Sequence, residues 1–278
     1  MEPDGLHTPV IKRHSLDKLR RHNYYAAIFS AAMHRKWPQR AYVGLYSGAG
    51  RARLADTGEI VETSAMAVVR QGVPFTKYIF VDEDRQCLDA LRARVRAASP
   101  EADVTFVLGS VSSSIGDVVE AMPRYRSEHG GLLSLCFVDP FRVDLDFGVI
   151  RELNRFMMDF LIMLPLGFDV RRNVQRYLSD PENKLGALID APDWRREWRE
   201  RGESEKHFIR FVWMKFDQAM QRLDFRARDI SETLPVKVTG MGVYLYSLAL
   251  YSKHELGERF WRTTIEGTDT TPQFGLGL

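Results

Sequence analysis

The stretch Tyr42-Val-Gly-Leu-Tyr-Ser-Gly-Ala-Gly-Arg51 decides the fold of this chain. It begins as an apolar run and ends in a tight turn built around Gly48 and Gly50. Glycine permits positive φ and lets a ligand approach the bare backbone, so the turn predicts a strand that ends at a binding site. A second apolar run, residues 77–82, ends in Asp82. A glycine turn after one strand and a carboxylate after the next is how a doubly wound sheet holds a nucleoside.

The turn favours one kind of nucleoside over others. A third glycine is missing from Gly48-Ala-Gly-Arg-Ala-Arg53, which argues against a dinucleotide and its pyrophosphate. S-adenosylmethionine (SAM) has no pyrophosphate and fits better, and we expect Asp82 to bind its ribose. Plainer interpretations stay open, because the glycines can simply make a strand-to-helix turn and Asp82 and Asp84 can cap the next helix.

Strands and helices are expected to alternate through the first part of the chain. Apolar runs predict strands at about 41–46, 77–82, 104–107, 132–138 and 160–164, and the residues at 51–61 predict a polar loop. Periodic segments predict helices at about 15–34, 62–71, 84–97, 112–122 and 146–156. Such alternation with short links is typical of a parallel sheet.

The alternation stops after Gly167. Residues 168–224 are predicted to form helices only, among them an arginine-dense stretch at 194–201. This stretch could bind a phosphate backbone with aromatic support. We favour an amphipathic surface helix, because Trp194 and Trp198 share one face. The remaining predicted elements are a strand at 225–230 or 234–238, a strand at 243–251, a hairpin turn around Gly240 and Gly242, a helix at 254–262, and a poorly ordered tail from Thr263.

Composition places the chain among ordinary globular proteins. It has 278 residues, 45% of them hydrophobic and 27% charged. The net charge of +2 means that any basic surface must be local. The two cysteines, Cys87 and Cys136, and the seven histidines show no spacing of a metal site or a disulfide. With no signal peptide and no apolar run long enough to span a membrane, a cytoplasmic location is expected.

Five short motifs follow one another between residues 15 and 262. They are Ser15-Leu-Asp-Lys18, Ser47-Gly-Ala-Gly-Arg51, Phe80-Val-Asp-Glu-Asp84, Phe137-Val-Asp-Pro-Phe141 and Tyr246-Ser-Leu-Ala-Leu-Tyr-Ser-Lys-His254. In this order they resemble the three-Cys-motif partner (TcmP) family, of the class I SAM-dependent methyltransferase type. The resemblance implies a Rossmann-like α/β fold and a radical-SAM-like partner protein that carries the three-Cys motif.

The expected architecture is a single methyltransferase-like domain. Its seven-stranded sheet should be mostly parallel, with an antiparallel last strand and a helical insertion between strands five and six. The four parts of the domain are an N-terminal helical cap at 1–40, a SAM-binding core at 41–167, the insertion at 168–224, and a terminal hairpin and helix at 225–262.

Asp139-Pro140-Phe141 is the sharpest catalytic candidate, because it ends the central strand of the predicted sheet. It resembles the Asp-Pro-Pro-aromatic motif of enzymes that methylate exocyclic amines of bases. A proline turn with a buried phenylalanine is an equally weighted alternative. The predicted cofactor-binding residues are Tyr46, Gly48, Gly50, Asp82, Ser110 and Asp139, and the predicted substrate-binding residues are Arg142, Arg171 and Arg172.

The chain departs from the family pattern at several of these positions. Gly44 stands where such proteins usually have an acid, Ser110 replaces an acid near the adenine amine, and Arg142 replaces a glycine. The leading hypothesis is a SAM-dependent methyltransferase that acts on DNA or RNA together with its partner. Two alternatives remain: a non-catalytic adaptor that keeps the fold, and a small-molecule methyltransferase whose helical insertion is a lid.

Overall fold

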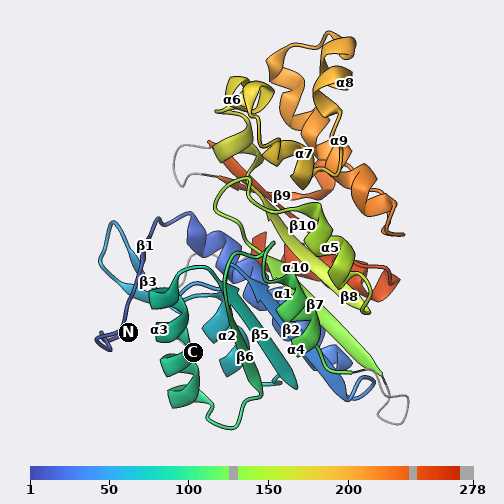
Figure 1. Cartoon of the computed structure of the whole chain (residues 1–278). Coiled ribbons are helices and arrows are strands. Elements are labelled where there is room, and N and C mark those ends of the chain that lie inside the picture. Colours follow the sequence, from blue (N-terminus) through green and yellow to red (C-terminus); the bar gives the residue numbers. More distant parts are fainter. Residues whose placement is uncertain (125–130, 238–242, 270–278) are drawn as a thin grey trace.

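The computed structural model describes residues 1–124, 131–237 and 243–269, which fold around one large sheet (Figure 1). The strand order is β6-β5-β2-β7-β8-β10-β9. Strand β10 runs antiparallel to both of its neighbours, and the pairs among β6, β5, β2, β7 and β8 are parallel. This is the predicted Rossmann-like methyltransferase fold. The strands are β2 Gln39–Leu45, β5 Lys77–Asp82, β6 Val104–Leu108, β7 Leu132–Val138, β8 Met158–Leu164, β9 Leu234–Lys237 and β10 Tyr244–Tyr251.

Two apolar layers cover the faces of this sheet, because successive side chains of a strand point to opposite sides. In β5, Tyr78 and Phe80 belong to one buried cluster, and Ile79 and Val81 belong to the other. The central strands are buried on both faces, which explains their continuous apolar sequences. The first face packs α1 Ser15–Met33, α2 Ser64–Arg70, α3 Arg85–Ala98 and α10 Glu255–Asp269; the second packs α4 Ile115–Ala121 and α5 Phe147–Leu153.

The segment between β8 and β9 is helical, as predicted, and forms the lobe at the top of Figure 1. Trp194 and Trp198 are buried against Phe208 and Phe211, so the arginine-dense stretch is an amphipathic helix. The guanidinium of Arg195 donates to backbone carbonyls of the same lobe. The lobe contains η2 Leu166–Val170, α6 Val174–Ser179, α7 Lys184–Leu188, α8 Trp194–Arg201, η3 Glu205–His207 and α9 Phe208–Gln221, and η4 Ile230–Glu232 follows it.

The polar loop predicted at 51–61 is wrong. Strands β3 Arg51–Leu54 and β4 Ile60–Glu62 form a hairpin there, and β1 Val10–Ile11 pairs with β3 to make a second, three-stranded sheet. In β3 the buried residues Ala52 and Leu54 alternate with the partly buried Arg51 and Arg53. A strand of four residues with half of its positions charged gives little signal, and one of its two pairing partners, β1, lies far away in the chain.

The C-terminal part differs from the prediction in one respect. Helix α10 continues through Asp269, whereas a poorly ordered tail was predicted from Thr263. Thr264 and Thr268 are buried, and their hydroxyls donate to the carbonyls of Phe260 and Thr264, respectively. The polar side chains that suggested a disordered tail are thus hydrogen-bonded within the helix. The strand after the insertion is β9, at the second of the two predicted positions. The turn around Gly240 and Gly242 lies outside the described residues.

Both cysteines are buried and free. Within the described ranges, no helix combines the length and the apolar character that a membrane span requires.

Candidate functional site

The turn after β2 has a backbone that alternates into the left-handed region. Tyr46, Gly48 and Gly50 have φ of +64°, +63° and +80°. The side chain of Ser47 ties the turn to the sheet, since its hydroxyl donates to the carbonyl of Gly44 at 2.7 Å and accepts from the amide of Val81 at 3.1 Å. The turn is therefore fixed in place next to the end of β5.

Asp82 lies against this turn, as the sequence predicts. The amide of Gly48 donates to Asp82 Oδ2 at 2.7 Å, and the amide of Asp84 donates to Oδ1 at 2.9 Å. Burial raises the pKa of Asp82, and these two bonds oppose the rise. A carboxylate has about four acceptor positions, so Asp82 keeps capacity for hydroxyl donors. Asp84 caps α3, where it accepts from the amides of Gln86 and Cys87.

The two turn glycines serve different purposes. A Cβ on Gly48 would meet no atom within 4 Å, so this position faces open space. A Cβ on Gly50 would lie 2.7 Å from Leu91 Cδ1 and 2.7 Å from Met66 Cγ. Gly50 therefore allows α2 and α3 to pack against the turn, and Gly48 is the position where a ligand can approach the backbone.

Ser110 follows β6 at the same edge of the sheet. The amide of Gly109 donates to the carbonyl of Asp82 at 3.0 Å, which keeps the ends of β5 and β6 together. The Ser110 side chain is exposed, and its hydroxyl lies 2.7 Å from that of Ser113. Ser110 is thus accessible beyond the end of β6, at the edge of the sheet where Asp82 ends β5.

Asp139 ends the central strand β7 and is paired with a lysine of the first helix. Lys18 Nζ lies 2.8 Å from Asp139 Oδ1 and 2.6 Å from Oδ2. Burial raises the pKa of Asp139. The charge and the hydrogen bonds of Lys18 partly offset this rise. The pair neutralises a carboxylate that is only 13% exposed, at the strand end where the acceptor site was predicted.

Tyr46 faces the carboxylate of Asp144, in the loop that follows β7. Burial raises the pKa of the Tyr46 phenol, and Asp144 raises it further; burial also raises the pKa of Asp144 itself. The half-buried ring packs on the core beside the turn. Tyr46 thus links the turn after β2 to the loop after β7.

A cleft of about 330 Å³ lies between that loop and the helical lobe. Phe141 is 70% exposed there, and its ring packs edge-on against Phe168 at 5.4 Å between centroids. Phe168 also stacks on Tyr246 at 6.0 Å and carries the guanidinium of Arg172 over its face at 5.3 Å. The basic side chains that line the cleft are Arg142, Arg172, Arg176 and Lys184, and the acidic ones are Asp169 and Asp180.

The structure brings together part of the predicted acceptor site. Phe141, Arg142 and Arg172 line the cleft, whereas Arg171 is exposed and is not among its lining residues. Pro140 is buried. Asp139 lies outside the lining set, although its charge acts on Tyr246, which stacks on Phe168.

Several residues of the site were missed from the sequence, namely Lys18, Phe168, Arg176, Lys184 and Tyr246. Lys18 stands in a motif of the family resemblance, which was a usable signal for its importance. The aromatic residues looked like ordinary core positions, since Phe168 opens the helical segment and Tyr246 belongs to a strand.

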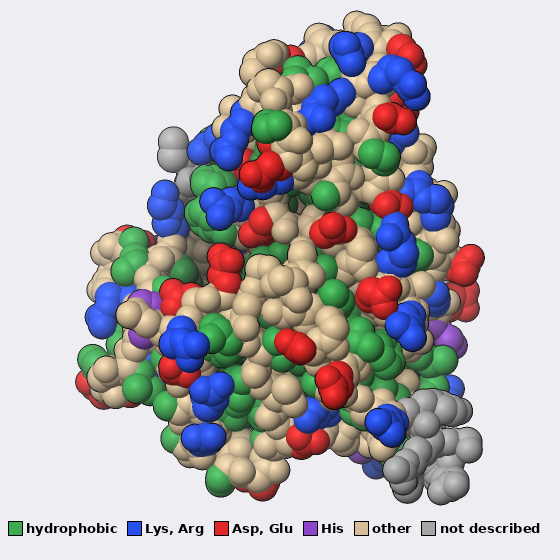
Figure 2. Space-filling model, in the orientation of Figure 1, with side chains coloured by type: hydrophobic (Ala, Val, Ile, Leu, Met, Phe, Trp, Pro, Cys, Tyr) green, Lys and Arg blue, Asp and Glu red, His purple; other side chains and the backbone are tan. Residues whose placement is uncertain are grey.

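Basic side chains are not confined to the cleft. Figure 2 shows Lys and Arg over the upper lobe, interspersed with Asp and Glu. Asp180 accepts from backbone amides of Glu182 and Lys184, and Asp169 accepts from the amide of Val143. These two acids thus hold backbone in place. Lys184 pairs with Glu182, so the three arginines of the cleft face two acids that are already engaged.

The N-terminal segment is tied to the glycine turn by Arg94. Its guanidinium donates to both carboxylate oxygens of Asp4 at 2.8 Å and to the carbonyl of Ala49 at 2.6 Å. The segment also brings His7 to Asp84 and Cys87, with ligand atoms within 4.8 Å of one another. Burial raises the pKa of the Cys87 thiol to about 12, and Asp84 is occupied as a helix cap, so we assign this group a structural role.

No family profile and no curated protein sequence matches this chain. Solved structures are similar to it at a distance. An O-methyltransferase from Bacillus cereus in complex with SAH has a TM-score of 0.44 at 9% identity, covering 82% of this chain and 80% of that one. The O-methyltransferase TomG from Streptomyces achromogenes, in complex with SAM, has a TM-score of 0.43 at 11% identity, with coverages of 82% and 79%.

The methyltransferase domain of bacterial CtHen1-CN has a TM-score of 0.38 at 10% identity and covers 84% of this chain and 99% of that one. These likenesses carry no inference about activity, ligand or partner. The fold follows from the strand order of the chain itself, and the function must be argued from its own residues.

Proposed function

We propose that this protein binds SAM at the carboxyl edge of its sheet and methylates a nucleic acid, together with a radical-SAM-like three-Cys-motif partner. The observation that supports the cofactor most directly is the contact between the Gly48 amide and the Asp82 carboxylate. It sets a turn of bare backbone against an acid with free acceptor positions, which suits ribose hydroxyls. The partner rests on the family resemblance alone.

The residues at the neighbouring strand ends fit a nucleoside with an attached sulfonium. Gly48 offers open space above the turn, and Ser110 offers an exposed hydroxyl beyond β6. Tyr46 closes the turn on the side of Asp144. SAM supplies an electrophilic methyl group when it is bound. The chain itself needs chiefly to align the acceptor and to exclude water, which does not require a strong acid or base.

The acceptor cleft suits a flat, anionic substrate. The exposed ring of Phe141 can stack on a base, and the three arginines of the cleft can contact phosphates, whereas Lys184 is paired with Glu182. Asp139 uses one lone pair on each oxygen for Lys18 and retains others that can accept from an amine. Asp139 therefore acts, in this proposal, as an acceptor that orients the amine, with Lys18 as the residue that positions it.

A non-catalytic adaptor is the second candidate, and one contact favours it. Because Lys18 engages both oxygens of Asp139, the carboxylate is less available to a substrate than an unpaired one. An adaptor would keep the fold and bind its partner without methyl transfer to any oligonucleotide, and failure to bind SAM and S-adenosylhomocysteine would favour it.

Calorimetric titration with both nucleosides tests the cofactor site. Asp82→Ala should weaken SAM binding about ten- to a hundred-fold, since hydrogen bonds to a charged group contribute roughly 1.5–3 kcal/mol. Asp89→Ala is the matched control, because Asp89 is an exposed acid of α3 that pairs with Arg92. Absence of binding to either nucleoside, or equal affinities for Asp82→Ala and the wild type, would contradict the cofactor site.

Oligonucleotide binding at several salt concentrations tests the acceptor class. Affinity for single- or double-stranded oligonucleotides should fall steeply between 50 and 200 mM salt, because phosphate contacts release counterions. Arg172→Glu should weaken binding, whereas Arg196→Glu should not, because Arg196 is exposed on α8 and pairs with Asp193. A flat salt response would point to a small-molecule acceptor. Co-purification tests the partner separately. The three-Cys-motif protein should co-purify with this chain, and its absence would contradict the proposed partnership.

A further inference from the structure

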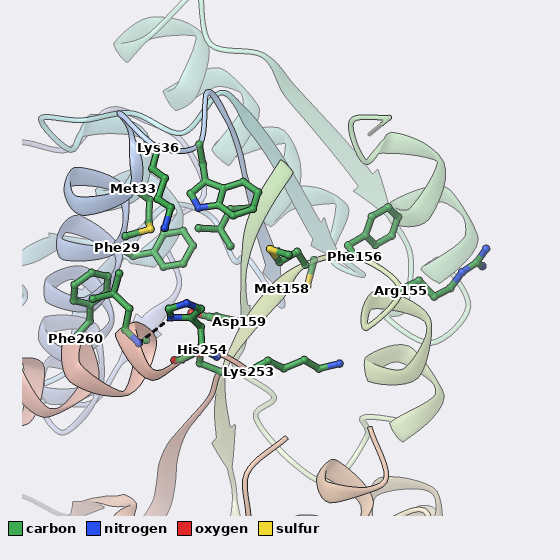
Figure 3. A pocket seen from close by; sticks show the side chains of 16 residues that line it. Phe29, Met33, Lys36, Arg155, Phe156, Met158, Asp159, Lys253, His254 and Phe260 are labelled. Atoms are coloured by element: carbon green, nitrogen blue, oxygen red, sulfur yellow. Dashed lines mark hydrogen bonds between the residues drawn. The ribbon is translucent and has the colours of Figure 1, made fainter. Parts of the chain in front are cut away.

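A second cavity lies at the opposite edge of the sheet, away from Gly48 and Asp82. Its volume is about 450 Å³, within the range of small-molecule sites. It opens where β7 and β8 begin, between the end of α1 and the start of α10 (Figure 3). None of the predicted or observed residues of the cofactor and acceptor sites lines it.

The walls of this cavity are apolar and adaptable. Aromatic rings of Phe29 and Phe260 and the thioethers of Met33 and Met158 surround it in Figure 3. Methionine side chains are flexible and fill irregular spaces, so such a wall accommodates an apolar body without a fixed shape. An apolar cavity of this size favours a ligand with a substantial hydrocarbon part.

The mouth of the cavity holds donors for an anion. Figure 3 shows the Lys36 side chain reaching toward the cavity from the end of α1. Among the residues that the structure describes, no carboxylate forms an ion pair with Lys36. His254 Nδ1 accepts from the amide of Leu256 at 3.1 Å, so a neutral His254 ring carries its proton on Nε2 and can donate it.

The other charged lining residues are already engaged. Arg155 pairs with Glu152, and the ammonium of Lys253 lies over the ring of Phe225 at 5.0 Å. Both side chains point away from the cavity in Figure 3. Asp159, on the floor, accepts from the hydroxyl of Tyr25 at 3.1 Å. Among the described residues that line the cavity, Lys36 is therefore the cation that is available to an occupant.

We propose that this cavity binds a mainly apolar monocarboxylate, with its hydrocarbon part between α1 and α10 and its carboxylate at Lys36 and His254. The apolar walls and the cationic mouth together favour a monocarboxylate over a neutral hydrocarbon and over an alkylammonium. A neutral hydrocarbon would leave the Lys36 charge unused, and an alkylammonium would place a second cation beside it.

Linear probes of known charge test the proposal on the full chain. Decanoate should bind saturably, and octanoate, with two methylenes fewer, should bind about sixteen-fold more weakly, because each buried methylene changes affinity about four-fold. Decylamine and decan-1-ol, used below their aggregation limits, should bind more weakly than decanoate. Binding should quench Trp37, which lines the cavity, and Trp37→Phe should remove that signal while calorimetry still detects binding.

Charge reversal at the mouth gives the matched comparison. Lys36→Glu should weaken decanoate binding at least ten-fold and leave decan-1-ol nearly unchanged, whereas Lys206→Glu, at an exposed lysine of the helical lobe, should change neither. Circular dichroism of each variant confirms that the fold is retained. No saturable decanoate binding, tighter binding of decylamine than of decanoate, or equal affinities for Lys36→Glu and the wild type would overturn the proposal.

Discussion

Lys18 Nζ bonds both carboxylate oxygens of Asp139, at 2.8 Å and 2.6 Å, across 121 residues of sequence. One end of the pair belongs to the first turn of α1 and the other to the end of the central strand. The ammonium therefore holds the N-terminal helix over the edge of the sheet where the acceptor site is proposed. It also supplies the charge that opposes the rise in the pKa of Asp139 caused by burial.

Replacing Lys18 by methionine should destabilise the protein in a pH-dependent way. Without its counter-charge the pKa of Asp139, already raised by burial, should rise further. The native state then holds the Asp139 proton more tightly than the unfolded state, so stability is complete at low pH and lost as pH rises through the native pKa. We expect a loss of about 1–3 kcal/mol in the free energy of unfolding near pH 8 and a smaller loss near pH 5.

Urea denaturation at the two pH values measures this loss. The double variant Lys18→Met with Asp139→Asn should recover most of the stability near pH 8, because it removes the unpaired charge. A loss that is the same at both pH values would show that Lys18 acts by packing alone.

Asp159 predicts a second pH effect at the other end of the sheet. Burial raises its pKa to about 6, and Glu258 adds to the rise, while Tyr25, Ser252 and Arg228 oppose it. The contribution of Asp159 to the free energy of unfolding is therefore complete below about pH 4, which is the pKa of Asp in the unfolded chain. This contribution is lost as pH rises through about 6. Asp159→Asn keeps an acceptor for Tyr25 and cannot ionise.

Thermal and urea unfolding of Asp159→Asn should depend less on pH than unfolding of the wild type. Between about pH 5 and pH 8 the difference should be about 1–3 kcal/mol. Asp103→Asn serves as the control, since Asp103 is an exposed acid at the start of β6 that pairs with Lys77. The prediction fails if the wild type and Asp159→Asn show parallel pH profiles.

At Tyr46 we expect glycine to be more stable than alanine, which is the reverse of their usual order in a helix. Its φ of +64° is a conformation that costs an L-residue about 1 kcal/mol and glycine almost nothing. Both Tyr46→Gly and Tyr46→Ala lose the ring, so their difference isolates the backbone. Tyr46→Gly should be about 1 kcal/mol more stable than Tyr46→Ala by urea denaturation.

The same pair of substitutions in a helix should show the ordinary order. At Tyr24, in α1, alanine should be more stable than glycine by about 1 kcal/mol. Equal stabilities of Tyr46→Gly and Tyr46→Ala would mean that the turn relaxes out of the left-handed region when the ring is removed.

The two turn glycines should separate stability from binding. Gly50→Ala adds a methyl group where Leu91 and Met66 already lie, so it should cost about 2–4 kcal/mol from crowding and positive φ together. Gly48→Ala should cost only about 1 kcal/mol, because its Cβ meets no atom. Relative to the stability that each variant loses, Gly48→Ala should nevertheless weaken SAM binding more than Gly50→Ala does. Denaturation and calorimetry on both variants measure the contrast, and equal costs would contradict it.

The parts of the molecule that could be predicted have local causes. The glycine turn and the acid after β5 follow from the chemistry of a few adjacent residues, and the central strands follow from apolar runs buried on both faces. The amphipathic helix at Trp194 follows from the spacing of two tryptophans. In each case the sequence pattern itself contains the physical reason.

The parts that could not be predicted depend on distant pairings. Strand β3 pairs with the nearby β4 and also with β1, some forty residues earlier, and Lys18 acquires its role only when α1 packs over β7. For the cavity between α1 and α10, the sequence contained one usable signal of a special site. Asp159 is the single acid in the otherwise apolar strand β8. A charged residue in such a strand is rarely buried without a purpose.

Helix α1 also constrains the order in which this chain can fold. Its buried face meets partners that are made much later: Lys18 pairs with Asp139, and Tyr25 with Asp159, 134 residues further on. At a synthesis rate of about 5–20 residues per second, Tyr25 waits roughly 7–27 s for Asp159 to leave the ribosome. During that time the residues of α1 that meet β7 and β8 have no partner, although Phe29 can already pack on Phe75, and the uncovered part of the helix is open to chaperones or to other nascent chains. Refolding of the full chain from denaturant, in which every partner is present at once, should therefore be less prone to aggregation than refolding of a fragment that stops before β8.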